Sequence, residues 1–427
     1  MHALAMAGRW AGALGLLLWV IVMASPAASQ PDQRRPRVVT GADVLVQSRF
    51  AMLAGRRVGL VTNQTGLSGG RHMVDLMVEA GVRLTAILAP EHGFRGAVEA
   101  GAKVADEVDA RTGVAVHSLY GATRKPTRRM LRDVDVLVFD IQDIGVRFYT
   151  YISTMGLAMQ AAAEAHIPFV VLDRPNPLGG EHVAGFVCEP ALTSFVGQYP
   201  IPIQHGLTVG ELARMIKGER WLGRLDKLNL TVVAMKGWQR AMRWPDTGLA
   251  WVATSPNIPT FEAALVYPGI GIVGELAVNE GRGTPIPFSQ FGAPWLDGER
   301  LAERLWAAPL EGVSFSATSY MPRPIAGIAS KPRFAGERVG GVKLAVTDVA
   351  RFAPLEAGMH ALAGLMAEAR RAGRTRMFPN LAMFHRIAGT RRLHRLLQEG
   401  RDGEAIAAAW AREVAAFKAQ RARYLAY

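Results

Sequence analysis

The chain has 427 residues, of which 50% are hydrophobic, and 49 Lys and Arg against 36 Asp and Glu give a formal net charge of +13. Cys188 is the only cysteine, which excludes an internal disulfide, so the fold must be stabilised by buried apolar surface. Most of the excess charge falls in residues 370–427. Such runs are usually solvated helix faces, so we favour that interpretation over a site for a polyanion such as an acidic cell-wall polymer or a lipid headgroup. We expect no nucleic-acid partner, because the segment lacks a recognisable nucleic-acid-binding motif and the protein is expected to be exported.

Residues 1–29 predict a secretory signal peptide. Arg9 provides a short basic region, residues 11–23 form an apolar stretch, and residues 24–29 are small, as at a cleavage site. The apolar stretch is short for a membrane span and no stop-transfer pattern follows it. We therefore expect an exported protein, periplasmic or secreted, without a stable membrane anchor; an uncleaved anchor is the weaker alternative.

The next part of the chain predicts alternating strands and helices. Strands are expected at 56–63, 82–90, 113–120, 133–141, 167–173 and 229–235, and helices at 71–81, 148–166 and 208–219. The last helix begins with Thr208 and Glu211, the pattern of a capping box. Near-continuous apolar runs separated by helices indicate a parallel sheet covered on both faces. We expect a Rossmann-like α/β catalytic domain over residues 40–262.

Composition changes in residues 244–295, which are rich in Pro, Gly and Trp and show little periodicity. Alternation then returns, with a helix at 298–307, strands near 312–320 and 341–347, a helix at 354–371 and a helical C-terminus. We place a domain boundary near residue 262. A second, smaller α/β domain over residues 263–427 would complete a cleft with the first domain.

Polar residues follow four of the predicted strands. The segments are TNQTG (62–66), PEHG (90–93), DIQDIGVRFYTY (140–151) and DRPNP (173–177). Structural explanations exist: Glu91–His92 could be a solvated turn, or His92 could hydrogen-bond a backbone carbonyl. Asp140 and Asp173 could cap helices, and Asp173–Arg174 could be a local ion pair. Ligands of open α/β sheets bind beyond the carboxyl ends of the strands, so the four segments together favour a functional site.

The sequence lacks several common catalytic motifs. It contains no HExxH, no CxxC, no GxGxxG after the first strand and no GxSxG. Glu91, His92, Asp140 and Asp143 could in principle bind a metal, but they lack the regular ligand spacing typical of metal sites. We therefore expect no nucleotide cofactor and no metal, and favour acid–base chemistry.

The chain resembles a known family over residues 45–427. The shared motifs are GLVTNQTG, PEHGFRG, SLYG, RKPT, DVLVFDIQDIGVRFYTYISTM, VLDRPNPLGG, IPIQHGLTVGELA, SPNIPT, NEGRGT, PF and GAPW. Together they are similar to the exo-acting β-N-acetylmuramidases of bacterial cell-wall recycling, the NamZ type. One local departure is the Gly-Ile-Gly-Ile stretch at 269–272.

The resemblance implies release of N-acetylmuramic acid from the non-reducing end of peptidoglycan fragments. Glycosidic cleavage needs an acid to protonate the leaving oxygen, and we assign that role to Glu91, with His92 positioning it or binding a substrate hydroxyl. Asp143 and Glu280 are candidates for the second catalytic group, and the acetamido group of the substrate is a third.

Muramic acid carries a lactyl carboxylate, which calls for an arginine, and Arg147, Arg174 and Arg282 are the candidates. Tyr149 and Tyr151 offer aromatic faces to a sugar ring. The full set of expected substrate-binding residues is Asn63, Gln142, Arg147, Tyr149, Tyr151, Asp173, Arg174, Asn176, His205, Asn257 and Arg282.

Two other functions remain open from the sequence. The chain could be a peptidoglycan amidase or deacetylase with a metal at Glu91, His92 and Asp143, which would make it sensitive to chelators. It could also be a non-catalytic protein that binds cell-wall sugars, although the intact Glu91 and the polar strand ends argue against this.

Overall fold

The computed structural model describes residues 37–96, 98–99, 101–102 and 106–427. The predicted signal peptide lies outside these residues. Within the described part of the chain, no helix is both long and apolar enough to cross a membrane.

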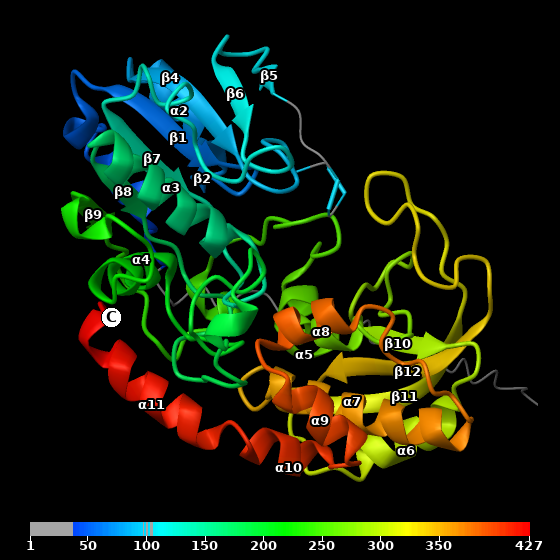
Figure 1. Ribbon diagram of the computed structural model, residues 1–427. Helices are drawn as coiled ribbons and strands as arrows, with labels where there is room; N and C mark the ends of the chain where they lie inside the picture. The colour runs from blue at the N-terminus through cyan, green and yellow to red at the C-terminus, as the bar shows by residue number, and fades with distance from the viewer. Residues whose placement is uncertain (1–36, 97, 100, 103–105) are drawn as a thin grey trace, which may run out of the picture. The chain divides into compact units, whose positions relative to one another are not determined.

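A seven-stranded sheet organises the first half of the chain (Figure 1). In spatial order its strands are β5 (Glu107–Val108), β6 (Ala115–Ser118), β4 (Arg83–Ala89), β1 (Arg57–Thr62), β7 (Val136–Asp140), β8 (Phe169–Leu172) and β9 (Leu230–Val233). All neighbours pair in parallel except β5, which is antiparallel to β6. The six parallel strands lie in the order third, second, first, fourth, fifth, sixth along the chain, which is the Rossmann order. The predicted Rossmann-like sheet is confirmed.

Both faces of this sheet are buried, as the apolar runs predicted. Along β1, Val58 and Leu60 belong to one hydrophobic core and Val61 belongs to the other. The helices of this part are α1 (Gly41–Gln47), α2 (Met73–Glu79), α3 (Tyr151–Ala165) and α4 (Val209–Gly218). The capping box predicted for Thr208 and Glu211 is present at the start of α4.

A smaller antiparallel sheet follows, with strand order β10 (Gln290–Ala293), β12 (Val339–Val346), β11 (Val313–Tyr320). The helices of the second half are α5 (Phe261–Val273), α6 (Gly298–Trp306), α7 (Pro354–Arg371), α8 (Leu381–Ala388), α9 (Arg392–Gln398), α10 (Gly403–Ala408) and α11 (Ala411–Arg421). A short hairpin, β2 (Leu67–Ser68) and β3 (Arg71–His72), and the 3-10 turns η1 (Ala51–Leu53), η2 (Pro190–Leu192), η3 (Leu225–Lys227), η4 (Trp244–Thr247) and η5 (Ala422–Tyr424) complete the described elements.

The end of the chain returns to the Rossmann-like sheet. After α11 it reaches α4, where the C-terminus is marked in Figure 1. The Tyr424 hydroxyl donates to Glu219 Oε1 at 2.7 Å, and the Tyr427 hydroxyl donates to Asp173 Oδ2, also at 2.7 Å. The larger hydrophobic core includes both Phe139 on β7 and Val342 on β12, so side chains from both sheets share it. The domain boundary near residue 262 stays a prediction.

Helix α5 lies within the segment that showed no periodicity in the sequence. Its side chains are buried on nearly all sides, so no polar face marks the helix, and it contains Pro268. Gly269 lies against Gly358 of α7, where an added Cβ would come within 2.3 Å of the Pro354 carbonyl oxygen. The glycine-rich stretch therefore allows two helix backbones to approach closely.

Candidate functional site

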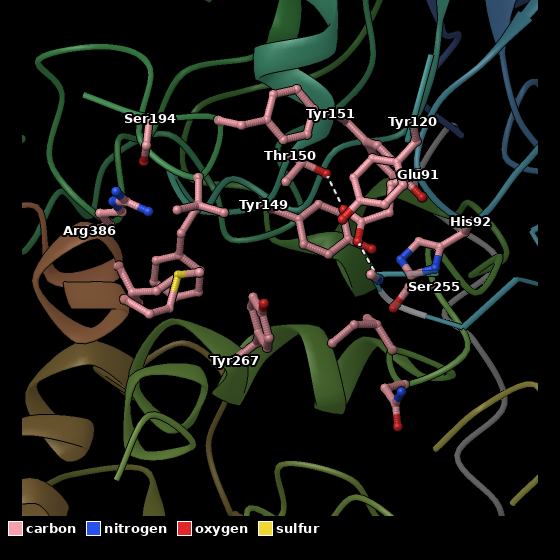
Figure 2. A pocket seen from close by; sticks show the side chains of 18 of the residues that line it. Glu91, His92, Tyr120, Tyr149, Thr150, Tyr151, Ser194, Ser255, Tyr267 and Arg386 are labelled. Atoms are coloured by element: carbon pink, nitrogen blue, oxygen red, sulfur yellow. Dashed lines mark hydrogen bonds between the residues drawn. The ribbon is translucent and has the colours of Figure 1, made fainter. Parts of the chain in front are cut away.

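A pocket of about 470 Å³ lies where loops of the Rossmann-like sheet meet residues of the second half of the chain (Figure 2). Its walls come from the loops after β4, β6 and β7, the loops at 194–196 and 255–258, helix α5 with the segment after it, and helix α8. The residues that line it include Glu91, His92, Gly101, Tyr120, Arg124, Phe148, Tyr149, Thr150, Tyr151, Ser194, Phe195, Val196, Asn257, Tyr267, Glu275, Arg282, Phe288, Met383, Arg386 and Ile387.

Glu91 stands at the carboxyl end of β4 with its carboxylate in the pocket. Thr150 Oγ1 donates to Glu91 Oε2 at 2.7 Å, and the backbone N–H of Gly101 donates to Oε1 at 3.0 Å (Figure 2). Burial and the nearby charge of Glu91 raise the pKa of the Tyr120 phenol to about 12. The predicted acid is thus held in a fixed orientation by donors from two different loops.

His92 has a backbone φ of 71°, in the left-handed region that a non-glycine residue rarely adopts. Its Nδ1 lies 2.7 Å from the Val98 carbonyl oxygen, and because a carbonyl can only accept, Nδ1 carries the proton. Burial lowers the pKa of the imidazole despite the adjacent Glu91. The neutral ring therefore has a bare Nε2 that can accept a hydrogen bond from a substrate hydroxyl.

Aromatic rings form the middle of the pocket. Tyr149 packs edge-on against Tyr151 at 5.0 Å and against Tyr267 at 5.9 Å, and Tyr267 in turn meets Phe148 and Phe288. The Tyr149 hydroxyl donates to Thr254 Oγ1 at 2.8 Å, which fixes the ring. The two predicted tyrosines thus lie in the pocket wall. Tyr267, which the sequence did not indicate, joins them because α5 packs against the loop after β7.

Arg282 and Glu275 line the pocket from the segment that follows α5. Arg282 donates to Glu280 Oε1 at 2.5 Å and lies 5.1 Å above the Phe288 ring. Glu280 is almost fully buried and is not among the lining residues. Glu275 does line the pocket, and burial together with the charge of Glu280 raises its pKa, against the opposing effect of Arg282. Sequence reasoning missed Glu275 because no apolar strand precedes it.

Asn257, the remaining predicted residue of the second half, lines the pocket and donates from Nδ2 to the Ile328 carbonyl at 2.7 Å. Among the predicted residues, the structure thus brings together Glu91, His92, Tyr149, Tyr151, Asn257 and Arg282.

The loops after β1 and β8 line a different, smaller cavity of about 90 Å³. Arg174 lies there, and its guanidinium donates to Asp140 Oδ1 at 2.7 Å and to the Leu67 carbonyl at 3.0 Å. Gln142 donates from Nε2 to the carbonyls of Asp143 and Pro175. Asn63 Oδ1 accepts from both the backbone and the hydroxyl of Thr65.

These contacts correct the expectation for Arg174, Gln142 and Asn63. Their polar groups hold the strand ends of the sheet together and do not line the larger pocket. The prediction that all four polar loops converge on one site is therefore wrong for the loops after β1 and β8, whose polar groups are structural.

Arg147 is fully buried and also lies outside the larger pocket, although Phe148 beside it lines the wall. Its guanidinium donates to the carbonyls of Phe186, Ile201 and Ile387, at 2.6–2.9 Å. A guanidinium surrounded by backbone in this way is not available to a substrate carboxylate. It instead joins three distant segments of the chain.

Asp143 is similarly turned away from the larger pocket. Its Oδ2 accepts from the Gly145 N–H at 2.6 Å, which closes a tight turn, and burial raises the pKa of its carboxyl to about 7. The structure does not place it with Glu91 and His92. Within the described part of the chain, no three or more His, Cys, Asp or Glu side chains are grouped so that they could hold a metal ion.

The other predicted binding residues, Asp173, Asn176 and His205, are also buried outside the pocket. Asp173 accepts from the Gly210 N–H and from Thr208 Oγ1, so it caps the start of α4. Asn176 accepts from Leu178 N and donates to the Leu207 carbonyl. Burial lowers the pKa of His205 to about 3, so this imidazole is neutral and structural.

Comparisons with known proteins cover nearly the whole chain. Residues 58–262 match the family model described as exo-β-N-acetylmuramidase NamZ, N-terminal, and residues 265–427 match its C-terminal counterpart. The chain is 41% identical over 412 residues to the peptidoglycan β-N-acetylmuramidase NamZ of Bacillus subtilis (strain 168), covering 95% of each protein.

Two solved structures of DUF1343 family proteins from Bacteroides fragilis NCTC 9343 have the same fold. One is 40% identical with a TM-score of 0.84, and the match covers 92% of this chain and 100% of that one. The other is 32% identical with a TM-score of 0.74, covering 92% and 99%.

Proposed function

Because this chain belongs to the exo-β-N-acetylmuramidase NamZ family, we propose that it hydrolyses peptidoglycan fragments and releases N-acetylmuramic acid from their non-reducing end. The observation that carries this proposal is the position of Glu91. Its carboxylate enters an aromatic-lined pocket and is oriented there by Thr150 and the Gly101 N–H.

Glu91 would act as the general acid. In its protonated form it transfers a proton to the glycosidic oxygen as the bond to C1 breaks, so the leaving sugar departs as an alcohol and not as an alkoxide. Thr150 can turn its hydroxyl to donate to the carboxylate that remains. His92 Nε2, on the adjacent residue, accepts from a hydroxyl of the sugar and fixes the ring relative to the acid.

The second catalytic group must stabilise the positive charge that develops at C1. Asp143 lies outside the pocket and Glu280 lies behind Arg282, so neither predicted carboxylate is well placed for this role. Glu275, which lines the pocket, and the acetamido group of the substrate are the better candidates.

We further propose that the protein works outside the cytoplasm, where peptidoglycan lies. Support for this comes from the basic, apolar and small-residue pattern of residues 1–29. Expression of the full chain, followed by cell fractionation and N-terminal sequencing, tests it. A protein retained in the cytoplasm with an intact N-terminus would contradict this part of the proposal.

The activity itself is tested with a chromogenic aryl β-N-acetylmuraminide and with a peptidoglycan-derived disaccharide that has N-acetylmuramic acid at its non-reducing end. We expect both to release N-acetylmuramic acid, and chelators to have no effect. Products cleaved at the amide or N-acetyl bond, with the glycan intact, would favour an amidase or deacetylase. Binding without any cleavage would favour a sugar-binding protein.

A further inference from the structure

The three arginines that the sequence offered for the lactyl carboxylate all have other partners. Arg147 is held by three backbone carbonyls, Arg174 by Asp140 and Arg282 by Glu280. A carboxylate that approached Arg282 would have to compete with Glu280 and would also meet the negative charge of Glu275. The pocket therefore needs another cation for an acidic sugar.

Two further arginines line the pocket, Arg124 and Arg386. Arg124 lies over two aromatic rings, 4.4 Å from the centre of the Phe195 ring and 5.8 Å from the centre of the Tyr120 ring. Arg386, on α8, makes no ion pair or ring contact with any described residue. It lies at the end of the pocket opposite Glu91 and His92, with Tyr149 between them (Figure 2).

A second polar group without a partner lies at the same end. Ser194 lines the pocket, and its Oγ is buried and has no hydrogen-bond partner among the described residues. The loop of Ser194 packs on α8, since a Cβ added to Gly197 would lie 3.5 Å from the Arg386 carbonyl oxygen. A buried hydroxyl without a partner costs free energy, so we expect a bound ligand to accept its hydrogen bond.

The surroundings of these two groups are apolar. Val196, two residues after Ser194, lines the pocket, as do Met383 and Ile387, which lie beside Arg386 on α8. A lactyl ether combines a methyl group with a carboxylate on one carbon, so it would place its methyl against these side chains and its charge on the guanidinium. This combination of one cation, one free hydroxyl and an apolar wall matches a lactyl group better than it matches a neutral sugar hydroxyl.

We propose that Arg386 and Ser194 form the subsite that binds the lactyl carboxylate of the N-acetylmuramic acid ring whose bond is cleaved. Arg386 pairs with the carboxylate, Ser194 Oγ donates to it, and the ring spans the aromatic middle of the pocket toward Glu91. This inference rests on the proposed function, and it makes Arg386 the residue that separates muraminides from glucosaminides.

The test compares Arg386→Gln and Ser194→Ala with the unchanged protein on three substrates with one aryl leaving group. These are the N-acetylmuraminide, its lactyl methylamide and the N-acetylglucosaminide. Arg386→Gln should lower kcat/KM for the muraminide about tenfold to a hundredfold, the usual effect of a hydrogen bond to a charged group. Ser194→Ala should lower it less. Both changes should lower kcat/KM for the methylamide and the glucosaminide less than for the muraminide, because only the muraminide carries the charge.

Arg391→Gln is the matched control, because Arg391 is exposed, lies five residues beyond Arg386 and does not line the pocket. An Arg386→Gln protein with unchanged preference for the muraminide overturns the subsite. An equal loss on all three substrates also overturns it, since that result indicates a disturbed fold or a role in catalysis. If the unchanged protein cleaves none of the substrates, the proposed function itself fails, which is a distinguishable result.

Discussion

Replacing Glu91 with glutamine tests the central catalytic assignment, because it keeps the size of the side chain and removes the transferable proton. A positioned general acid contributes about 10²–10⁴ to the rate, or about 3–5 kcal/mol of barrier. We therefore expect kcat on a natural disaccharide, whose leaving group is a sugar alcohol, to fall by that factor. An aryl muraminide has a better leaving group that needs less protonation, so its kcat should fall much less.

The effect of the same change on folding should be small. The carboxylate accepts one hydrogen bond from Thr150 and one from the Gly101 N–H, and a glutamine carbonyl can keep at least one of them. The expected loss of unfolding free energy is at most about 0.5–1.5 kcal/mol, the value of one hydrogen bond. Urea denaturation measures this loss, and Glu107→Gln, at an exposed acid on β5, is the control.

Chromatography measures the release of N-acetylmuramic acid, with each substrate at a saturating concentration. A folded Glu91→Gln protein with full activity on the natural disaccharide would remove Glu91 from the mechanism. An equal loss on both substrates would also refute the reasoning, because an acid that protonates the leaving oxygen must discriminate between leaving groups.

Two further predictions concern buried charges outside the pocket. Arg174→Met should lower the free energy of unfolding, measured in urea, by about 3–5 kcal/mol, because it leaves the Asp140 carboxylate buried without its cation. Adding Asp140→Leu should restore much of this loss. A double variant no more stable than the single one would contradict the reasoning. Burial raises the pKa of Asp173 to about 6. The free energy of unfolding that this group contributes therefore falls as pH rises from about 4 to about 6. The Tyr427 hydroxyl opposes the pKa shift, because it donates to the ionised carboxylate. Tyr427→Phe should therefore lower the free energy of unfolding by about 1 kcal/mol more at pH 8 than at pH 4. It also leaves the Met235 N–H without its partner, and that loss should be the same at both pH values. Urea midpoints that shift equally at pH 4 and pH 8 would contradict the assignment.

The Rossmann-like sheet could be predicted because its determinants are local in the sequence. A strand buried on both faces must be apolar at every position, as β7 is, and such a run is visible without knowledge of its neighbours. The capping box of α4 is local in the same way, since Thr208 and Glu211 are three residues apart. Helix α5 was not predicted, because a helix buried on nearly all sides shows no amphipathic period in the sequence. Its glycine at 269 serves the close contact with α7, which only the folded chain shows.

The pocket was only partly predictable, because membership of a site depends on where a side chain points and what else competes for it. Glu91 and Arg174 both follow strands of the same sheet, and the sequence offers no reason to treat them differently. Folding gives Arg174 a buried partner in Asp140, whereas Glu91 faces the pocket and accepts from Thr150 in another loop and from the Gly101 N–H in its own.

The fold class and the family could be inferred from the sequence, since both depend on contiguous motifs. Which arginines line the pocket without an acidic partner depends on the folded chain. Arg386 lies almost 300 residues from Glu91 in the chain, and no pattern of spacing connects them. A pocket assembled from distant segments is set by packing, and packing is a property of the folded chain as a whole.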